Sequence, residues 1–195
     1  MTENNLTYDD IAELFVSLNT NPVNILRSSA LASYASLEAN LASLFAALLE
    51  VPPKIADVVF WKILNTRSRC DMLTDLMKIR FQKKYEKWWS SMLKDIRGID
   101  QGRNKVAHWR ATDFHDSRLN TKQTVLMNPS KNFLFEPEKG MSERDLARLI
   151  RRTNFASSDV IEFAFYIQGL LSLPPDKFLK PRVYPSLETH PVPRN

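Results

Sequence analysis

The chain has 195 residues and a mass of 22.6 kDa, and 44% of its residues are hydrophobic, which favours one globular domain over a disordered chain. The net charge is +5, and one cysteine, Cys70, excludes an internal disulfide and fits a reducing compartment. The start MTENNLTYDD is too acidic for a signal peptide, and the apolar run over 41–49 is too short to span a membrane, so we expect a cytoplasmic protein without membrane contact.

Two helices are expected in the first 50 residues. The run Thr7-Tyr8-Asp9-Asp10 resembles a capping box and predicts a short helix to about residue 18. Asn21-Pro22 predicts the start of a long second helix, because Pro is favoured in a first turn. That helix carries an apolar stripe at 3-4 spacing, formed by Tyr34, Leu37, Leu41, Leu44 and Leu48. A parallel stripe of small residues, Ala32, Ala35, Ala39, Ala42 and Ala46, predicts burial on a second side.

The next segment is also helical in pattern. Val51-Pro52-Pro53 ends the second helix, and a third is expected from about 53 to 64. Another begins near Ser68, a plausible N-cap, and carries Met72, Leu73, Leu76, Met77 and Ile79. Apolar residues then continue at helical spacing and are assigned to the core: Phe81, Tyr85, Trp88, Met92, Ile96 and Ile99. Gly98 and Gly102 are expected to bend this helix.

The pattern changes after Trp109. Residues 111–140 contain two β-like runs, 121–128 and 132–136, which predict a short hairpin or an ordered loop. The run from Ser142 to Asp145 predicts a capped last helix to about residue 171. Residues 172–195 hold 6 Pro and are expected to form an extended tail. The predicted fold is therefore an all-α, antiparallel helical bundle over residues 1–171, with a β insertion and a tail.

The run Arg103-Asn104-Lys105-Val106-Ala107-His108 is the strongest candidate for a functional motif. Arginine holds phosphate through a fixed fork of donors, and histidine exchanges protons near neutral pH. Together they supply the groups needed to cleave a phosphodiester without a metal. A second pair with the same spacing, Arg110 and His115, lacks the polar residue after the arginine.

The motif resembles the R-[polar]-x3-H signature of the HEPN superfamily of small all-α domains. Other features agree with a bacterial HEPN-like group over residues 30–170: the basic helix start Thr66-Arg67-Ser68-Arg69, the aromatic residues Tyr85, Trp88 and Trp89, and the run R-N-x-x-A-H-W. The resemblance implies a metal-independent endoribonuclease of toxin–antitoxin or phage-defence type. The second hypothesis is a non-catalytic module that binds a protein or nucleotide, and a DNA-binding regulator is a third, weaker hypothesis.

The resemblance implies roles for individual residues. His108 acts as general base or acid, Arg103 binds the phosphate, and Asn104 orients the phosphate or His108. Candidates for contacts to the RNA backbone are Lys105, Arg110, Arg67 and Arg69. DNA, which lacks the 2′-OH, should not be cut by this route. We expect no metal and no cofactor, and an antitoxin or other protein partner is possible.

The phase of the motif predicts a dimer. Arg103 and His108 are five residues apart, so an unbroken helix would separate them by roughly 140° around its axis. A helix end, a bend at Gly102 or a second copy related by a twofold axis would bring them together, and HEPN nucleases use the homodimer. The structural alternatives are an ion pair between Arg103 and Asp100, and a hydrogen-bonded core position for His108 beside Trp109.

Positive charge is concentrated around the motif. Residues 1–50 have a net charge of −5, whereas residues 51–110 hold 14 basic and 6 acidic residues. Residues 111–195 have a net charge of only +2. This distribution predicts a polyanionic partner such as RNA, with a solvated lysine-rich helix face as the alternative.

Overall fold

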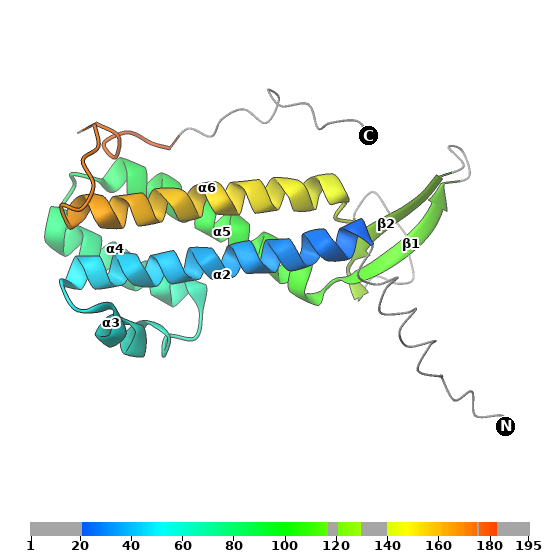
Figure 1. Ribbon diagram of the computed structural model, residues 1–195, viewed down its shortest axis with the longest axis horizontal. Helices are drawn as coiled ribbons and strands as arrows, with labels where there is room; N and C mark the ends of the chain where they lie inside the picture. The colour runs from blue at the N-terminus through cyan, green and yellow to red at the C-terminus, as the bar shows by residue number, and fades with distance from the viewer. Residues whose placement is uncertain (1–20, 117–120, 130–139, 175, 183–195) are drawn as a thin grey trace.

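The computed structural model describes residues 21–116, 121–129, 140–174 and 176–182, and this part of the chain is mostly helical (Figure 1). Its elements are α2 (Pro22–Leu49), α3 (Pro53–Phe60), α4 (Thr66–Phe81), α5 (Glu86–His108), β1 (Arg110–Asp116), β2 (Thr121–Met127) and α6 (Glu143–Ile167). The all-α class is confirmed, and the sheet within these residues has two strands. The helix expected over residues 7–18 lies outside the described residues.

The helix starts follow from local capping chemistry. The side chain of Asn21 accepts a hydrogen bond of 2.9 Å from the backbone N–H of Val23, and so begins α2 where the sequence predicts. Ser142 and Asp145 form the predicted capping box at the start of α6. At α4 the cap is Asn65, which accepts from the N–H of Ser68 at 2.8 Å, so this helix begins before the expected N-cap.

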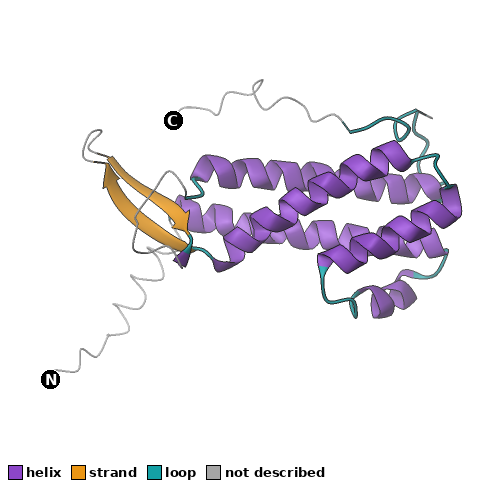
Figure 2. Cartoon of the chain, turned by 180° about the vertical axis from the view of Figure 1, so that it is seen from behind, coloured by secondary structure: helices purple, strands orange, loops and turns teal. Residues whose placement is uncertain are grey.

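Of the four long helices in the described residues, α2, α4 and α6 run in one direction and α5 runs against them (Figures 1 and 2). Val23 and Leu146, near the starts of α2 and α6, share one apolar cluster, and Asn40 donates to the Ser157 hydroxyl at 2.8 Å further along both helices. The expectation of a wholly antiparallel bundle is therefore wrong. The reason is that α3 and residues 61–65 carry the chain back along α2, so α4 runs parallel to it.

The main core lies between α2, α4, α5 and α6. The predicted apolar stripe of α2 is buried along its whole length, as are Trp88, Met92, Ile96 and Ile99 of α5. Burial of a large apolar side chain contributes about 1.5–3 kcal/mol. The small-residue stripe of α2 was predicted less well, because Ala42 and Ala46 are buried whereas Ala32, Ala35 and Ala39 are exposed. The short helix α3 packs against the C-terminal half of α2, where the Phe45 and Phe60 rings lie 5.8 Å apart.

Helix α5 continues unbroken through both of its glycines, so they do not end it before the motif. The glycines instead permit close approach of α6. A Cβ on Gly102 would lie 2.7 Å from Cδ1 of Leu149, and a Cβ on Gly98 would lie 2.9 Å from the Arg152 guanidinium. The missing side chains thus allow α5 and α6 to pack closely just before the motif.

The hairpin at one end of the bundle differs in pairing from the prediction (Figure 2). Strand β2 pairs antiparallel with β1, in a register from Arg110 opposite Met127 to Asp116 opposite Thr121. The sequence pattern indicated β2 but not β1, and the expected second run at 132–136 lies outside the described residues. Leu126 of β2 joins Val106 of α5 in the apolar cluster at this end, which fixes the hairpin against the last turns of α5.

The segment after α6 folds back onto the bundle, so the domain boundary expected at residue 171 is too early. Phe178 is 1% exposed, and its ring lies 4.9 Å from that of Phe163 and 5.2 Å from that of Trp88. The guanidinium of Arg182 contacts Asp95 at 2.7 Å. Only residues 172–174 and 176–182 of the expected tail are described.

Helix α2 is long and apolar enough to pass a length and composition test for a membrane span, although the sequence suggested no such stretch. Its most apolar window has a mean hydropathy of 1.2, and 50% of that window is buried inside the bundle. A core helix of a soluble protein has the same properties, so α2 gives no clear sign of a membrane protein.

Candidate functional site

The motif occupies the last two turns of α5, where two small or apolar residues anchor it. Val106 is fully buried in the end cluster, and Gly102 lies against Leu149. The carbonyl of Ala107 accepts a hydrogen bond of 3.0 Å from Arg27, which satisfies one of the free carbonyls at the helix end. The helix ends at His108, and the chain becomes extended at the next residue. The contacts of Gly102, Val106 and Ala107 therefore fix the position of the end of α5, and with it the backbone of the motif.

One face of α5 is polar and exposed, and it includes two residues of the motif. We name this face the α5 polar stripe; it consists of Lys94, Arg97, Gln101, Asn104 and His108, all exposed. At 100° per residue these five positions fall within an arc of about 80°. Asn104 and His108 are neighbours at i and i+4. The core position considered for His108 is therefore not observed, because its side chain is open to solvent.

Arg103 lies on another side of α5 and takes part in a polar cluster. Its guanidinium is 3.2 Å from Oδ1 of Asp100 and lies over the Tyr34 ring, 4.6 Å from the centroid. The same Asp100 oxygen is 2.8 Å from the Tyr34 hydroxyl and 3.1 Å from the Thr66 hydroxyl. The ion pair that was considered as an alternative role for Arg103 is therefore present, with 30% of the Arg103 side chain still exposed.

The electrostatics keep Arg103 charged and Tyr34 protonated at neutral pH. Partial burial opposes the charge of the Arg103 guanidinium, but the hydrogen bond to Tyr34 and the charges of Asp100 and Glu38 outweigh it and raise the pKa of Arg103. Burial raises the pKa of Tyr34 to about 12, so its hydroxyl stays protonated at neutral pH. Nε of Arg103 is buried without a hydrogen-bond partner among the described residues, so the guanidinium is incompletely satisfied.

Arg103 and His108 do not face each other within one chain. Because α5 is unbroken, their side chains leave the axis roughly 140° apart, one toward α2 and α4 and the other into solvent. The helix ends at His108, but this end does not rotate the two side chains together. A joint site for the two residues therefore requires a second molecule, either another copy of the chain or a substrate that reaches around the helix.

The four candidates for RNA-backbone contacts are placed differently. Lys105 is exposed, with its ammonium 5.1 Å from the centroid of the Trp109 ring, and Arg110 is exposed at the start of β1. Arg67 is 89% exposed and pairs loosely with Asp71 at 4.0 Å. These three side chains are accessible to a polyanion.

Arg69 is a structural residue. Its side chain is buried, donates to Glu38 at 2.5 Å and to the Ile63 carbonyl at 2.9 Å, and stacks on the rings of Phe60 and Trp61. A phosphate group would have to displace these contacts, so we remove Arg69 from the candidates for RNA binding. The sequence could not show that Arg69 is buried and Arg67 is exposed, because an arginine can occupy either position and its residue type does not reveal which face of α4 packs against other helices.

Four residues near the motif were not predicted from the sequence to belong to the site. Tyr34 lies under the Arg103 guanidinium and Thr66 bonds to Tyr34 and Asp100, while Arg97 and Gln101 extend the exposed face of His108. Counting helical phase back from His108 would have found Arg97 and Gln101. Tyr34 and Thr66 come from other helices, so no local pattern identifies them. Among the described residues, no group of three or more His, Cys, Asp or Glu side chains is placed to hold a metal ion.

Comparison with known proteins adds no assignment: no family model, no curated protein and no solved structure matches the chain.

Proposed function

We propose that the protein is a metal-independent endoribonuclease with a HEPN-like helical bundle, of toxin–antitoxin or phage-defence type, acting in the cytoplasm. The observation that carries the proposal is the exposure of Asn104 and His108 together at the end of α5. A histidine buried in the core could not reach a substrate, whereas this one can. The part-exposed and incompletely satisfied guanidinium of Arg103 supports the proposal as a phosphate ligand.

The reaction is a transesterification within RNA. The 2′-OH attacks the adjacent phosphorus, the bond from phosphorus to the 5′-oxygen of the next nucleotide breaks, and a 2′,3′-cyclic phosphate and a 5′-OH result. His108 removes the proton of the 2′-OH or protonates the leaving oxygen. Arg103 stabilises the charge that develops on the phosphate, and Asn104, one turn before His108, orients the phosphate or the imidazole.

The RNA strand is proposed to lie along the exposed basic residues near the motif. Lys94 and Arg97 belong to the α5 polar stripe. Three further exposed basic residues are Lys105 at the end of α5, Arg110 at the start of β1 and Arg67 on α4. Such contacts release counterions from RNA, so binding should weaken steeply with added salt. If RNA binding is undetectable at low salt, RNA is not the substrate and the nuclease proposal fails.

A twofold homodimer is proposed to complete the site, because one chain cannot aim both side chains at one phosphate. Light scattering should give twice the 22.6 kDa of the single chain. A mixture of Arg103→Ala and His108→Ala chains should regain part of the activity that each variant lacks, because one of the two sites in a mixed dimer is intact. A monomer at all concentrations, or no recovery in mixtures that exchange subunits, would contradict the composite site.

The experiment that tests the activity compares a single-stranded RNA with DNA of the same sequence. RNA should be cut to products with cyclic phosphate ends, DNA should remain whole, and a chelator should not change the rate. Cleavage of both nucleic acids, or loss of activity with the chelator, would contradict the proposed chemistry.

The alternative is a non-catalytic, HEPN-like dimeric module that binds a protein or a nucleotide. The ion pair of Arg103 with Asp100 favours this alternative, because it engages the arginine without any substrate. In that case, replacing Arg103 or Asp100 should lower the free energy of unfolding. RNA cleavage should be unaffected, because a non-catalytic module cuts no RNA. An antitoxin or another protein would then be the partner.

A further inference from the structure

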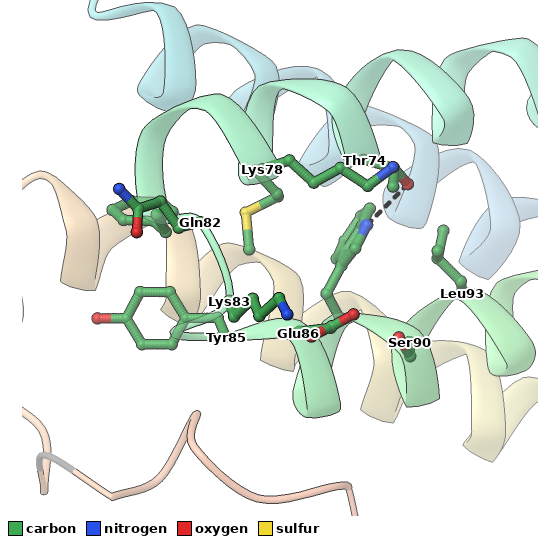
Figure 3. Close-up of a pocket in the computed structure, with 11 residues that line it drawn as sticks. Thr74, Lys78, Gln82, Lys83, Tyr85, Glu86, Ser90 and Leu93 are labelled. Atoms are coloured by element: carbon green, nitrogen blue, oxygen red, sulfur yellow. Dashed lines mark hydrogen bonds between the residues drawn. The ribbon is translucent and has the colours of Figure 1, made fainter.

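A pocket of about 390 Å³ lies between α4 and α5, at the end of α5 remote from the motif (Figure 3). It is formed by the last turns of α4, the turn that joins the two helices, and the first two turns of α5. Glu86 at this end and His108 are 22 residues apart, which corresponds to about 33 Å along a helix. The pocket is therefore separate from the motif, and a ligand could bind there whether or not the protein is a nuclease.

The floor of the pocket is apolar and aromatic. Met77 and Trp89 are buried beneath it, and Phe81 and Leu93 are partly buried at its sides. The indole Nε1 of Trp89 donates to the Thr74 hydroxyl at 2.9 Å, which fixes the orientation of the ring (Figure 3). A flat, fixed indole next to a thioether favours a planar aromatic ligand. The volume falls within the range of about 300–1,000 Å³ that is usual for small-molecule sites.

The rim of the pocket is positively charged. Lys78 and Lys83 are exposed and extend along opposite sides of the pocket, the first from α4 and the second from the turn (Figure 3). These two lysines are the basic residues of the described lining, which also contains one acidic residue, Glu86, so the formal net charge of the lining is +1. Lys78 has a loose, exposed partner in Asp75 at 3.6 Å, so an anion can compete for its ammonium group. The charge of the rim is complementary to a negatively charged group.

The turn that forms one wall of the pocket is held in a defined conformation. Gln82 has φ 52° and ψ −117°, a left-handed backbone that costs a residue with a side chain about 1–3 kcal/mol. Two hydrogen bonds fix the turn around it, from Gln82 N–H to the Lys78 carbonyl at 2.9 Å and from Lys84 N–H to the Phe81 carbonyl at 3.0 Å. The pocket is therefore formed before any ligand binds.

We propose that this pocket binds a small planar aromatic anion, a ring system that carries a carboxylate, sulfonate or phosphate group. The ring lies on Trp89 and Met77, and the anionic group lies between Lys78 and Lys83. Both halves of the ligand are required, because exposed ammonium groups alone bind anions weakly and the apolar floor alone does not select a charge.

The test uses the aromatic anion 1-anilinonaphthalene-8-sulfonate as a fluorescent probe and the uncharged N-phenyl-1-naphthylamine as its neutral counterpart. The sulfonate should bind the folded wild type saturably with one site per chain, and more tightly than the neutral compound. Near-UV circular dichroism should stay native during the titration, because partly unfolded proteins bind the same probe without specificity. Binding without saturation, or a preference for the neutral compound, would overturn the proposal.

Two variants and one control locate the site. Lys78→Glu with Lys83→Glu should weaken sulfonate binding about tenfold or more, by removing charge-assisted contacts. Ser90→Trp, at the edge of the pocket, should abolish binding by filling it. The control, Lys54→Glu with Lys62→Glu, makes the same charge change at two exposed lysines outside the pocket and should bind as the wild type does. Equal affinity in all four proteins would show that the probe binds elsewhere and would refute the site.

Discussion

The guanidinium of Arg103 lies 3.2 Å from a carboxylate oxygen of Asp100, one turn earlier on α5. The pair is only partly buried, with 30% of the arginine and 27% of the aspartate side chain exposed. A phosphate that binds Arg103 must therefore compete with Asp100, whose charge is attractive to the arginine and repulsive to RNA. Asp100 thus limits how strongly Arg103 can hold a substrate.

Asp100→Asn should tighten RNA binding, because it removes this negative charge and keeps oxygen and nitrogen groups for Tyr34 and Thr66. The gain should be less than about tenfold, since the pair is partly exposed and screened. The fold should lose about 1 kcal/mol, measured by urea denaturation. Asp71→Asn is the matched control, because it makes the same charge change at the exposed pair with Arg67. An equal gain in both variants would mean that net charge alone is responsible.

Gly102→Ala should destabilise the fold, and Gly98→Ala should not. The added methyl on Gly102 would lie 2.7 Å from Leu149 in the α5–α6 contact, and such overpacking costs about 1–3 kcal/mol. On Gly98 the atoms nearest to the methyl belong to the end of the flexible Arg152 side chain, and the better helix propensity of alanine, about 1 kcal/mol, offsets that contact. Thermal unfolding followed by circular dichroism separates these outcomes. A lower melting temperature for Gly98→Ala than for Gly102→Ala would contradict the packing described for this helix pair.

Phe178→Ala should cost about 3–5 kcal/mol in free energy of unfolding, because the ring is fully buried among aromatic residues of α5 and α6. The neighbouring Leu179 is 40% exposed, and Leu179→Ala should change stability by less than about 1 kcal/mol. Chemical denaturation of both variants measures the difference. Equal stability of the two would show that the segment after α6 does not contribute to the core.

Cys70 should be unreactive in the folded protein. Burial raises the pKa of its thiol to about 12, so almost no thiolate is present at neutral pH, and a disulfide reagent should modify it only after denaturant is added. The folded state also holds the thiol proton more tightly than the unfolded chain, whose cysteine pKa is 9.0. This contribution to stability is complete below pH 9.0 and is lost as the pH rises to about 12. Rapid labelling of the native protein at neutral pH would contradict the buried position.

Much of the fold follows from patterns that act over one or two helix turns. The stripe from Tyr34 to Leu48 has strict 3-4 spacing, and Asn21 and Ser142 are strong caps, so the start and buried face of α2 and the start of α6 could be predicted. Strand β1 was missed because its sequence, RATDFHD, does not alternate between apolar and polar residues. It is held instead by pairing with β2, which no local signal in β1 reveals.

Features that depend on distant residues were harder to predict. The proline content after residue 172 indicated an extended tail, but Phe178 finds a buried site created by α5 and α6. The exposure of His108 follows from helical phase and could be predicted in principle. The partners of Arg103 come from two helices, α5 and α2, and the sequence suggested only the local one, Asp100.

The most direct test of the nuclease proposal is cleavage of one end-labelled single-stranded RNA by the wild type, His108→Ala, Arg103→Ala and His115→Ala. Each of the first two variants should lose about 10²–10⁴-fold in rate, as expected when a general base or a phosphate ligand is removed, while light scattering shows the dimer unchanged. His115, which is exposed on β1, serves as the control and its variant should keep full activity. If the wild type cuts no RNA and the Arg103 and His108 variants only lower the melting temperature, these residues are structural and the partner-binding alternative is correct.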